Sequence, residues 1–124
     1  MSVDESVAAG WRRTGWWVAF GVSAMVNVVA VYAPAAGGGG LFAHADKLAH
    51  LLLFAVVGFT GRRAGVPGGL LLAVLVGHAV LSEAVQALTL PQRSGDAGDV
   101  GADVLGSLVG VWLGGGRRVS PGRP

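Results

Sequence analysis

The sequence predicts an all-α protein: an integral membrane four-helix bundle with both termini in the cytoplasm. Three observations lead to this fold class. Of the 124 residues, 52% are hydrophobic and only 13% are charged, whereas soluble domains carry about 25% charged residues. The apolar residues fall into four helix-length runs, separated by short stretches rich in charge, glycine or proline. The basic residues are divided unevenly between the two sides that these runs define.

The first apolar run, at about 16–33, follows a polar cytoplasmic tail at 1–15. Crossing the hydrocarbon core takes about 20 helical residues, so this run is long enough. Pro34 then ends the helix. A cleavable signal peptide is the alternative, because residues 33–35 (Ala-Pro-Ala) resemble a small-residue cleavage site. The run is longer, however, than the apolar core of about 7–15 residues that such peptides have.

The remaining spans follow at about 46–61, 70–88 and 99–114. Asp46 suits the first turn of its helix, because the helix dipole favours an anion there. A turn through Pro67 separates the second span from the third, and a polar loop through Pro91 separates the third from the fourth. The chain therefore divides into one membrane domain at 16–114, preceded by the polar tail and followed by a basic cytoplasmic tail at 115–124.

The orientation follows from the basic residues. With four spans, both ends of the chain share a side of the membrane with the turn between the second and third spans. Seven of the nine Lys and Arg residues fall on that side: Arg12, Arg13, Arg62, Arg63, Arg117, Arg118 and Arg123. Only Lys47 and Arg93 fall on the other side. Because short basic segments are retained in the cytoplasm, this bias predicts cytoplasmic termini for a multi-pass protein of the cell membrane.

This topology gathers polar side chains at the outer end of the bundle. They come from the starts of the second and fourth spans, the end of the third and the loop after it: Asp46, Lys47, His50, Glu83, Gln86, Arg93, Asp96, Asp99 and Asp103. Asp46 and His50 are four residues apart and share a helix face, as do Asp99 and Asp103. Ionisable groups at this depth in a membrane indicate a functional site.

The candidate catalytic residues are His50, Glu83, Asp99 and Asp103. His50 and Glu83 suit proton transfer, because a histidine titrates near physiological pH and a deep carboxylate needs a partner or a proton. Asp99 and Asp103 suit the orientation of water or of a cation. Carboxylate oxygens bind Mg²⁺ or Ca²⁺, and a histidine extends the choice to Mn²⁺ or Zn²⁺. The candidate metal ligands are Asp99, Asp103 and Glu83.

The candidate substrate-binding residues are Asp46, Lys47, Gln86, Arg93 and Asp96. Lys47 and Arg93 suit phosphate recognition, since Arg can bind two oxygens at once. The composition and the placement of the basic residues do not favour a nucleic-acid partner.

Each of these roles has a structural alternative. His50 can cap a polar network between helices. Glu83 can form an ion pair with Lys47 or Arg93 that holds helices together. Lys47 and Arg93 can instead pair with Asp96 or Asp99.

Below the polar residues, the sequence predicts close helix packing. Gly106, Gly110 and Gly114 recur at four-residue steps, and a stripe of glycines lets helices approach closely in a membrane. Asn27 and His78 fall near the middles of the first and third spans, where interhelical hydrogen bonding is their expected role.

Three motifs, in this order and spacing, resemble the VanZ-like family of small membrane proteins. They are Asp46-Lys47-x-x-His50-x-x-x-Phe54, then Ser82-Glu83-x-x-Gln86, then Arg93 followed by Asp99-x-x-x-Asp103-x-x-Gly106-x-x-x-Gly110. The resemblance covers about residues 46–110. Members of the family usually carry Asn at the position of Asp103, so the chain departs from the family there by one negative charge.

The resemblance implies an envelope protein that acts on phosphate-linked lipid or polyprenyl head groups at the outer leaflet, as a phosphoesterase or phosphotransferase. A divalent cation as cofactor and a membrane lipid or lipid-linked precursor as partner are consistent with that function. Two alternatives stay open. One is non-catalytic binding of such a precursor or of a glycopeptide antibiotic, as in teicoplanin-type resistance. The other is a structural membrane subunit, and an oligomer is open in each case.

Overall fold

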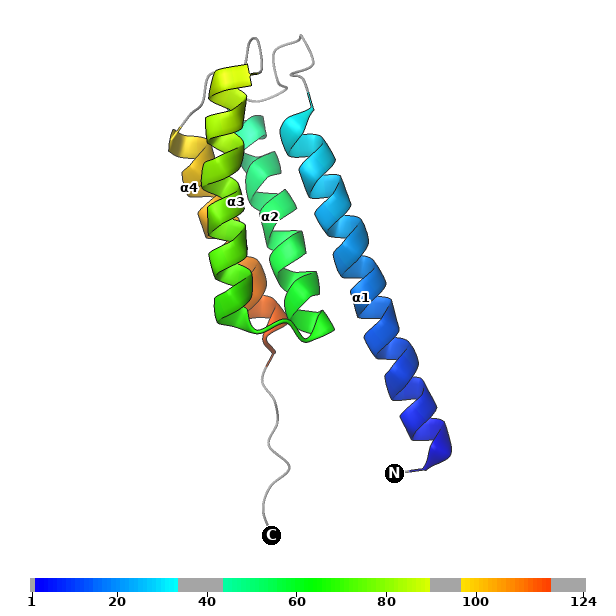
Figure 1. The fold of residues 1–124 in the computed structure, drawn as a ribbon. Coiled ribbons are helices and arrows are strands. Elements are labelled where there is room, and N and C mark those ends of the chain that lie inside the picture. Colours follow the sequence, from blue (N-terminus) through cyan, green and yellow to red (C-terminus); the bar gives the residue numbers. More distant parts are fainter. Residues whose placement is uncertain (1, 34–43, 90–96, 117–124) are drawn as a thin grey trace.

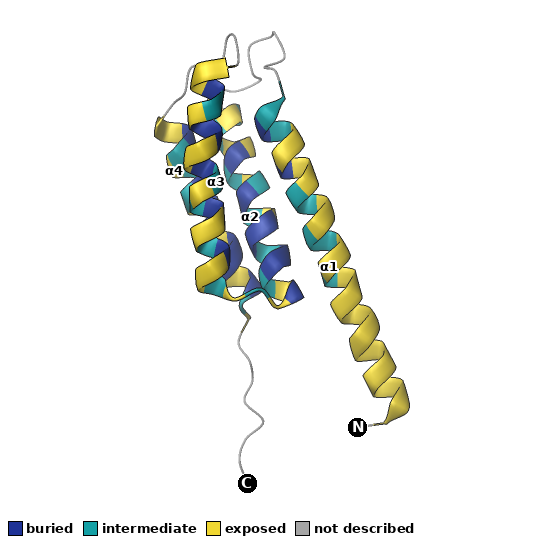
Figure 2. Cartoon of the chain, viewed as in Figure 1, coloured by how far each residue is buried: buried dark blue, intermediate teal, exposed yellow. Residues whose placement is uncertain are grey.

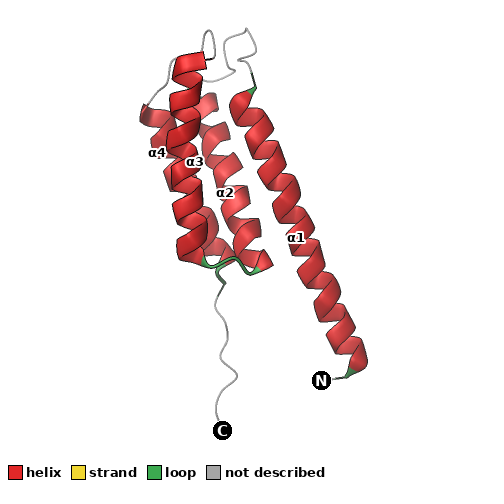
Figure 3. Ribbon diagram, viewed as in Figure 1, coloured by secondary structure: helices red, strands yellow, loops and turns green. Residues whose placement is uncertain are grey.

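The computed structural model describes residues 2–33, 44–89 and 97–116. These residues form four α-helices and contain no strand: α1 (Val3–Tyr32), α2 (Ala45–Ala64), α3 (Gly68–Thr89) and α4 (Ala97–Gly114), as Figures 1 and 3 show. The all-α, four-helix prediction is confirmed.

Consecutive helices run in opposite directions, so α1 begins at the same end of the molecule at which α4 ends (Figure 1). Helices α2, α3 and α4 form the compact part, with α2 and α4 in the most extensive contact. Helix α1 packs along α2, and its first turns extend beyond the other three helices (Figure 1).

Helix α1 begins at Val3, whereas the sequence predicted a polar tail before a span at about 16–33. The reason is a capping box. The Ser2 hydroxyl accepts a hydrogen bond from the Glu5 amide (3.3 Å), and the Glu5 carboxylate accepts one from the Ser2 amide (2.9 Å). This reciprocal pair satisfies two backbone donors that a helix start otherwise leaves open. The Ser-x-x-Glu pattern in the sequence indicates this earlier start of the helix.

The turn between α2 and α3 is shorter than expected. Arg62 and Arg63, predicted to lie in the turn, belong to the last turn of α2. The helix ends at Gly65, whose φ of 102° lies in the left-handed region that favours glycine. Pro67 then precedes the first residue of α3.

The glycine stripe of α4 faces α2, as predicted. A Cβ atom added to Gly106, Gly110 or Gly114 would meet the backbone carbonyl of Leu51, Ala55 or Phe59, respectively. Backbone against backbone is the closest packing that two helices can reach, and it requires glycine on one side.

Asn27 and His78 form an interhelical hydrogen bond, as expected, and they form it with each other. His78 Nε2 of α3 lies 3.0 Å from Asn27 Oδ1 of α1. The ring of Phe54 from α2 stacks on His78, with 5.5 Å between centroids. Phe54 is fully buried. One contact group thus ties three helices together in the centre of the bundle.

Many residues on the outer faces of the helices are exposed (Figure 2), and they include many large hydrophobic side chains. Helices α1 and α3 are long and apolar enough to cross a membrane by length and composition, and only 11% and 28% of their most apolar windows are buried. The core helix of a soluble protein passes the same test but has its apolar residues mostly buried. Exposed apolar helices of this length are compatible with a membrane-associated protein.

Candidate functional site

Five polar residues gather where α2 and α4 lie side by side at their N-terminal ends. We call them the polar cluster: Asp46, Lys47, His50, Asp99 and Asp103. Asp46 and Asp99 lie in the first turns of their helices, and His50 and Asp103 follow each of them by four residues. The same i, i+4 spacing on two neighbouring helices therefore presents two pairs of side chains to each other.

The deepest contact of the polar cluster joins His50 and Asp103. His50 Nδ1 lies 2.8 Å from Asp103 Oδ1, and the two side chains are 5% and 0% exposed. A carboxylate at Nδ1 holds the proton on that nitrogen and leaves Nε2 as the ring atom for a ligand or a proton. Among the described residues, Asp103 Oδ2 is buried and has no hydrogen-bond partner.

The cluster also contains a set of groups with metal-ligand spacing. Asp46, His50 and Asp99 each offer one ligand atom, and these atoms lie within 4.8 Å of one another. The sequence placed Asp99 in the metal set but combined it with Asp103 and Glu83. Within the described residues, Asp103 is instead bonded to His50, and Glu83 does not belong to this group.

Lys47 forms an ion pair with Asp99 across the two helices, with 3.3 Å from Nζ to Oδ1. The ion pair that the sequence offered as the structural alternative for Lys47 is therefore present, and its role in phosphate recognition stays a prediction. The side chain of Lys47 remains 38% exposed, whereas that of Asp99 is 9% exposed. The ammonium group thus lies at the rim of the cluster, where it contacts both Asp99 and the surroundings.

The two predicted site residues of α3 are buried: Glu83 is 7% and Gln86 is 2% exposed. Gln86 was predicted to bind substrate, but its side-chain amide donates a hydrogen bond of 2.6 Å to the Val31 carbonyl of α1. Gln86 therefore links α3 to the end of α1. Glu83 shares the buried face of α3 with Ser82, whose hydroxyl donates to the Ala79 carbonyl.

Arg93 and Asp96, the two predicted substrate-binding residues of the loop, lie outside the described residues. The structure thus brings together five of the nine predicted site residues and places two more on the buried face of α3. The sequence assigned Asp46 to substrate binding alone. Asp46 lies four residues before His50, and this spacing indicated that both could be metal ligands.

The arrangement suits a divalent cation. Two carboxylates and an imidazole form an oxygen-rich donor set of the kind that Mg²⁺ and Mn²⁺ accept, and a histidine also admits Zn²⁺. A histidine that ligates a metal usually donates its other N–H to a carboxylate, which fixes the ring orientation. Asp103 occupies that position relative to His50.

Comparison of the chain with protein-family models, with curated proteins and with solved structures finds no match.

Proposed function

We propose that this chain is a multi-pass membrane protein of the VanZ-like type that acts on phosphate-linked lipid head groups. Its polar cluster would lie at the outer leaflet and hold a divalent cation. The observation that carries the proposal is that one ligand atom each from Asp46, His50 and Asp99 lie within 4.8 Å of one another. The Asp103 carboxylate is bonded to the His50 ring.

Two features support the membrane part of the proposal. Helices α1 and α3 are long and apolar enough to cross a membrane, and most of their apolar windows are exposed. Because consecutive helices are antiparallel, the polar cluster lies at one end of the bundle. The basic residues lie at the other end: Arg12, Arg13, Arg62 and Arg63. A cytoplasmic position of the basic end would leave the polar cluster on the outer side.

The chemistry of the cluster matches a phosphate ester. A cation held by Asp46, His50 and Asp99 would bind a phosphate oxygen and a water molecule, and Lys47 would offset the remaining negative charge. In hydrolysis the water oxygen attacks phosphorus, and the bond from phosphorus to the lipid oxygen breaks. The proton lost by the water is returned to the lipid oxygen, so that the products are a lipid alcohol and phosphate.

Ligation of a cation changes the role of His50. His50 Nδ1 is bonded to Asp103, so a histidine that also held the cation would have no nitrogen left to accept a proton. Proton transfer, which the sequence assigned jointly to His50 and Glu83, would then not involve His50. Asp103 becomes a positioning residue, which acts through the orientation of His50.

Binding of Mn²⁺ to the purified protein tests the site, with free Mn²⁺ followed by electron paramagnetic resonance. Wild type should bind one ion, and Asp46→Asn/Asp99→Asn should lose at least tenfold in affinity. Gly101→Ala is the matched control in α4, because a Cβ at Gly101 meets nothing within 4 Å. Equal affinity in the double variant and the control would exclude the cation site.

Phosphate release from phosphatidic acid and from undecaprenyl phosphate tests the activity. Wild type with Mg²⁺ or Mn²⁺ should release phosphate, and the Asp46→Asn/Asp99→Asn variant should not. Saturable binding of these lipids with no product would instead indicate a binding protein. The assay therefore separates the enzyme from the non-catalytic alternative.

One observation favours a structural role as the second candidate. The Lys47–Asp99 and His50–Asp103 pairs both join α2 to α4, so they stabilise the bundle whether or not a ligand binds. In that case wild type would bind neither Mn²⁺ nor lipid phosphate. The Asp99→Asn change would then lower thermal stability and nothing else.

A further inference from the structure

A second charged cavity lies at the opposite end of the bundle from the polar cluster. It has a volume of about 420 Å³ and lies between the first half of α1 and the ends of α2 and α4. We call it the arginine pocket, after its lining residues Arg12, Arg13, Arg62, Arg63 and Trp16. Glycines at the ends of α2 and α4 complete the lining among the described residues, and none of these lining residues is acidic.

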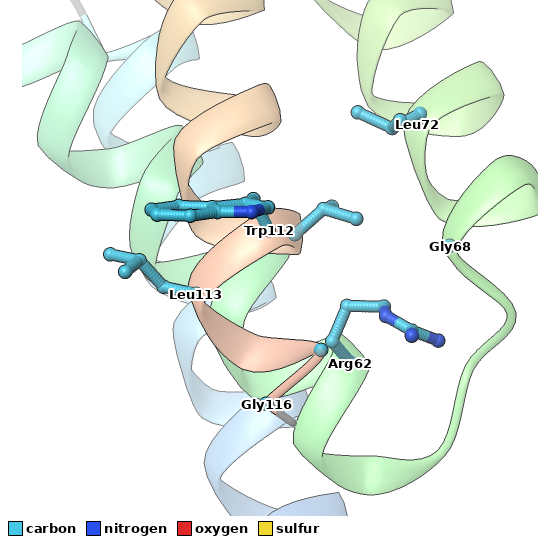
Figure 4. A pocket seen from close by; sticks show the side chains of 8 residues that line it. Arg62, Gly68, Leu72, Trp112, Leu113 and Gly116 are labelled. Atoms are coloured by element: carbon cyan, nitrogen blue, oxygen red, sulfur yellow. The ribbon is translucent and has the colours of Figure 1, made fainter. Parts of the chain in front are cut away.

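Two of the four arginines are held in position. The guanidinium carbon of Arg63 lies 5.0 Å from the centroid of the Trp16 ring, a cation–π contact. Trp16 in turn packs edge-to-face on Phe59 of α2, with 5.7 Å between centroids. Arg62 Nη1 donates a hydrogen bond of 3.0 Å to the Val66 carbonyl. The Arg62 side chain also lines a separate cavity between the start of α3 and the end of α4, which Figure 4 shows.

The charges of the arginine pocket are not balanced within the described part of the chain. None of its four arginines forms an ion pair with a carboxylate among the described residues. Four like charges around one cavity repel each other, and this repulsion is relieved when an anion binds between them. Guanidinium groups are suited to phosphate, because each can bind two oxygens at once.

An apolar groove lies between α1 and α2. The groove has a volume of about 670 Å³, and its lining includes Ala19, Val22 and Val26 of α1 and Leu52 and Val56 of α2. Its two hydroxyl groups, from Ser23 and Thr60, are hydrogen-bonded to each other at 2.8 Å. The surface that the groove offers to a ligand is therefore apolar.

The helical spacing places the pocket and the groove on one face of each helix. Ala19 follows Trp16 by three residues, and Thr60 precedes Arg63 by three, so pocket and groove are one helical turn apart on both helices. A ligand that fills both needs an anionic head and a hydrocarbon chain. A free phosphate fills only the first, and a neutral lipid satisfies only the second.

We propose that the seam between α1 and α2 binds an anionic phospholipid, with the headgroup phosphate in the arginine pocket and an acyl chain in the groove. This site is distinct from the polar cluster. It depends on the membrane location of the chain and is independent of any chemistry at the polar cluster.

Lipid binding to the full chain in a non-ionic detergent tests the proposal, with bound lipid counted by native mass spectrometry. Phosphatidylglycerol should bind at least tenfold more tightly than phosphatidylcholine of the same chain length. Arg12→Gln/Arg63→Gln should weaken phosphatidylglycerol binding about 30-fold, since each basic residue near an anionic lipid contributes a factor of about five. Phosphatidylcholine binding should not change.

Two matched variants separate a built site from diffuse attraction. Arg118→Gln/Arg123→Gln removes the same charge from residues 117–124 and should retain wild-type affinity for phosphatidylglycerol. Arg12→Lys/Arg63→Lys keeps the charge but loses the two-oxygen contacts, so its affinity should lie between those of wild type and the glutamine variant. Equal losses in the two glutamine variants would overturn the site.

Inorganic phosphate and filling of the groove distinguish the sources of the anion. Inorganic phosphate should displace phosphatidylglycerol only at millimolar concentration, and displacement at the lipid's own concentration would assign the pocket to free phosphate. Ala19→Phe, which fills the groove, should weaken phosphatidylglycerol binding and leave Mn²⁺ binding unchanged; retention of full lipid affinity would overturn the acyl-chain assignment. The lysine variant keeps the pocket testable if the glutamine variant does not fold.

Discussion

The packing of α4 against α2 depends on Gly110 having no side chain. A Cβ atom added there would overlap the carbonyl oxygen of Ala55 and lie 2.8 Å from both its carbonyl carbon and its Cα. All three atoms belong to the backbone of α2, so no side-chain rotation relieves the clash. Gly110→Ala therefore forces the two helices apart.

The size of the effect follows from these distances. Carbon atoms in contact lie about 3.5–4.0 Å apart, so the 2.8 Å contacts require a shift of α2 by about 1 Å. Overpacking of this kind costs about 1–3 kcal/mol. The better helix propensity of alanine returns about 0.5–1 kcal/mol. We expect Gly110→Ala to lower the free energy of unfolding by about 1–2 kcal/mol.

The assay is reversible unfolding of the detergent-solubilised protein, followed by circular dichroism. Gly101→Ala is the matched control on the same helix, because its added methyl group meets nothing within 4 Å. The control should be unchanged or up to about 1 kcal/mol more stable. If Gly110→Ala is as stable as Gly101→Ala, α2 and α4 do not pack backbone to backbone, and the interpretation of the glycine stripe is wrong.

Substitutions at three further residues separate positioning from packing. Asp103→Asn, whose amide oxygen can still accept the His50 N–H bond, should bind Mn²⁺ nearly as well as wild type, whereas Asp103→Leu should lose about 10–100-fold in titrations of the ion. Asn27→Leu removes the bond to His78 and should lower unfolding stability by about 0.6 kcal/mol in the same dichroism assay. Gln86→Leu should cause a similar loss of stability and leave Mn²⁺ and lipid binding intact, because its amide bonds the backbone of α1; weaker lipid binding at unchanged stability would restore its substrate role.

The four helices could be predicted from the sequence because hydrophobic runs mark the helices and glycine and proline residues mark the turns between them. Pro67 and the glycines before and after it mark the boundary between α2 and α3, which the structure shifts by only a few residues. The start of α1 differs from the prediction because the apolar run begins only at about residue 16, whereas the first turn of α1 is stabilised by the Ser2–Glu5 capping box. The Ser2-x-x-Glu5 capping pattern, and not hydrophobicity, therefore determines where α1 begins.

The membership of the polar cluster was predictable from topology, but its pairings were not. Helical spacing identified Asp46 with His50 and Asp99 with Asp103 as residues sharing a face. Which of them meet across the interface depends on the relative shift of α2 and α4 along their axes. Sequence periodicity contains no information about that shift. The bond from His50 to Asp103, and the placement of Gln86 against α1, therefore required coordinates.

The glycine stripe and the polar cluster are parts of one interface, and Gly106 is where they meet. Gly106 follows Asp103 by three residues, and a Cβ added to it would meet the backbone of Leu51, the residue after His50. The close approach at Gly106 is thus what allows the 2.8 Å contact between His50 and Asp103.

Gly106→Ala should therefore act on the site as well as on stability. Its added methyl group would lie 3.1 Å from Leu51 Cα and closer still to the Leu51 carbonyl. A separation of about 1 Å at this level stretches the His50–Asp103 bond beyond hydrogen-bonding distance. We expect Gly106→Ala to lose about tenfold or more in Mn²⁺ affinity, as expected for a lost outer-shell partner, whereas Gly110→Ala, one turn further from the cluster, should lose less. If both substitutions destabilise the protein equally and neither changes Mn²⁺ affinity, the helix approach does not set the geometry of the cluster, and the cation site has to be assigned to other residues.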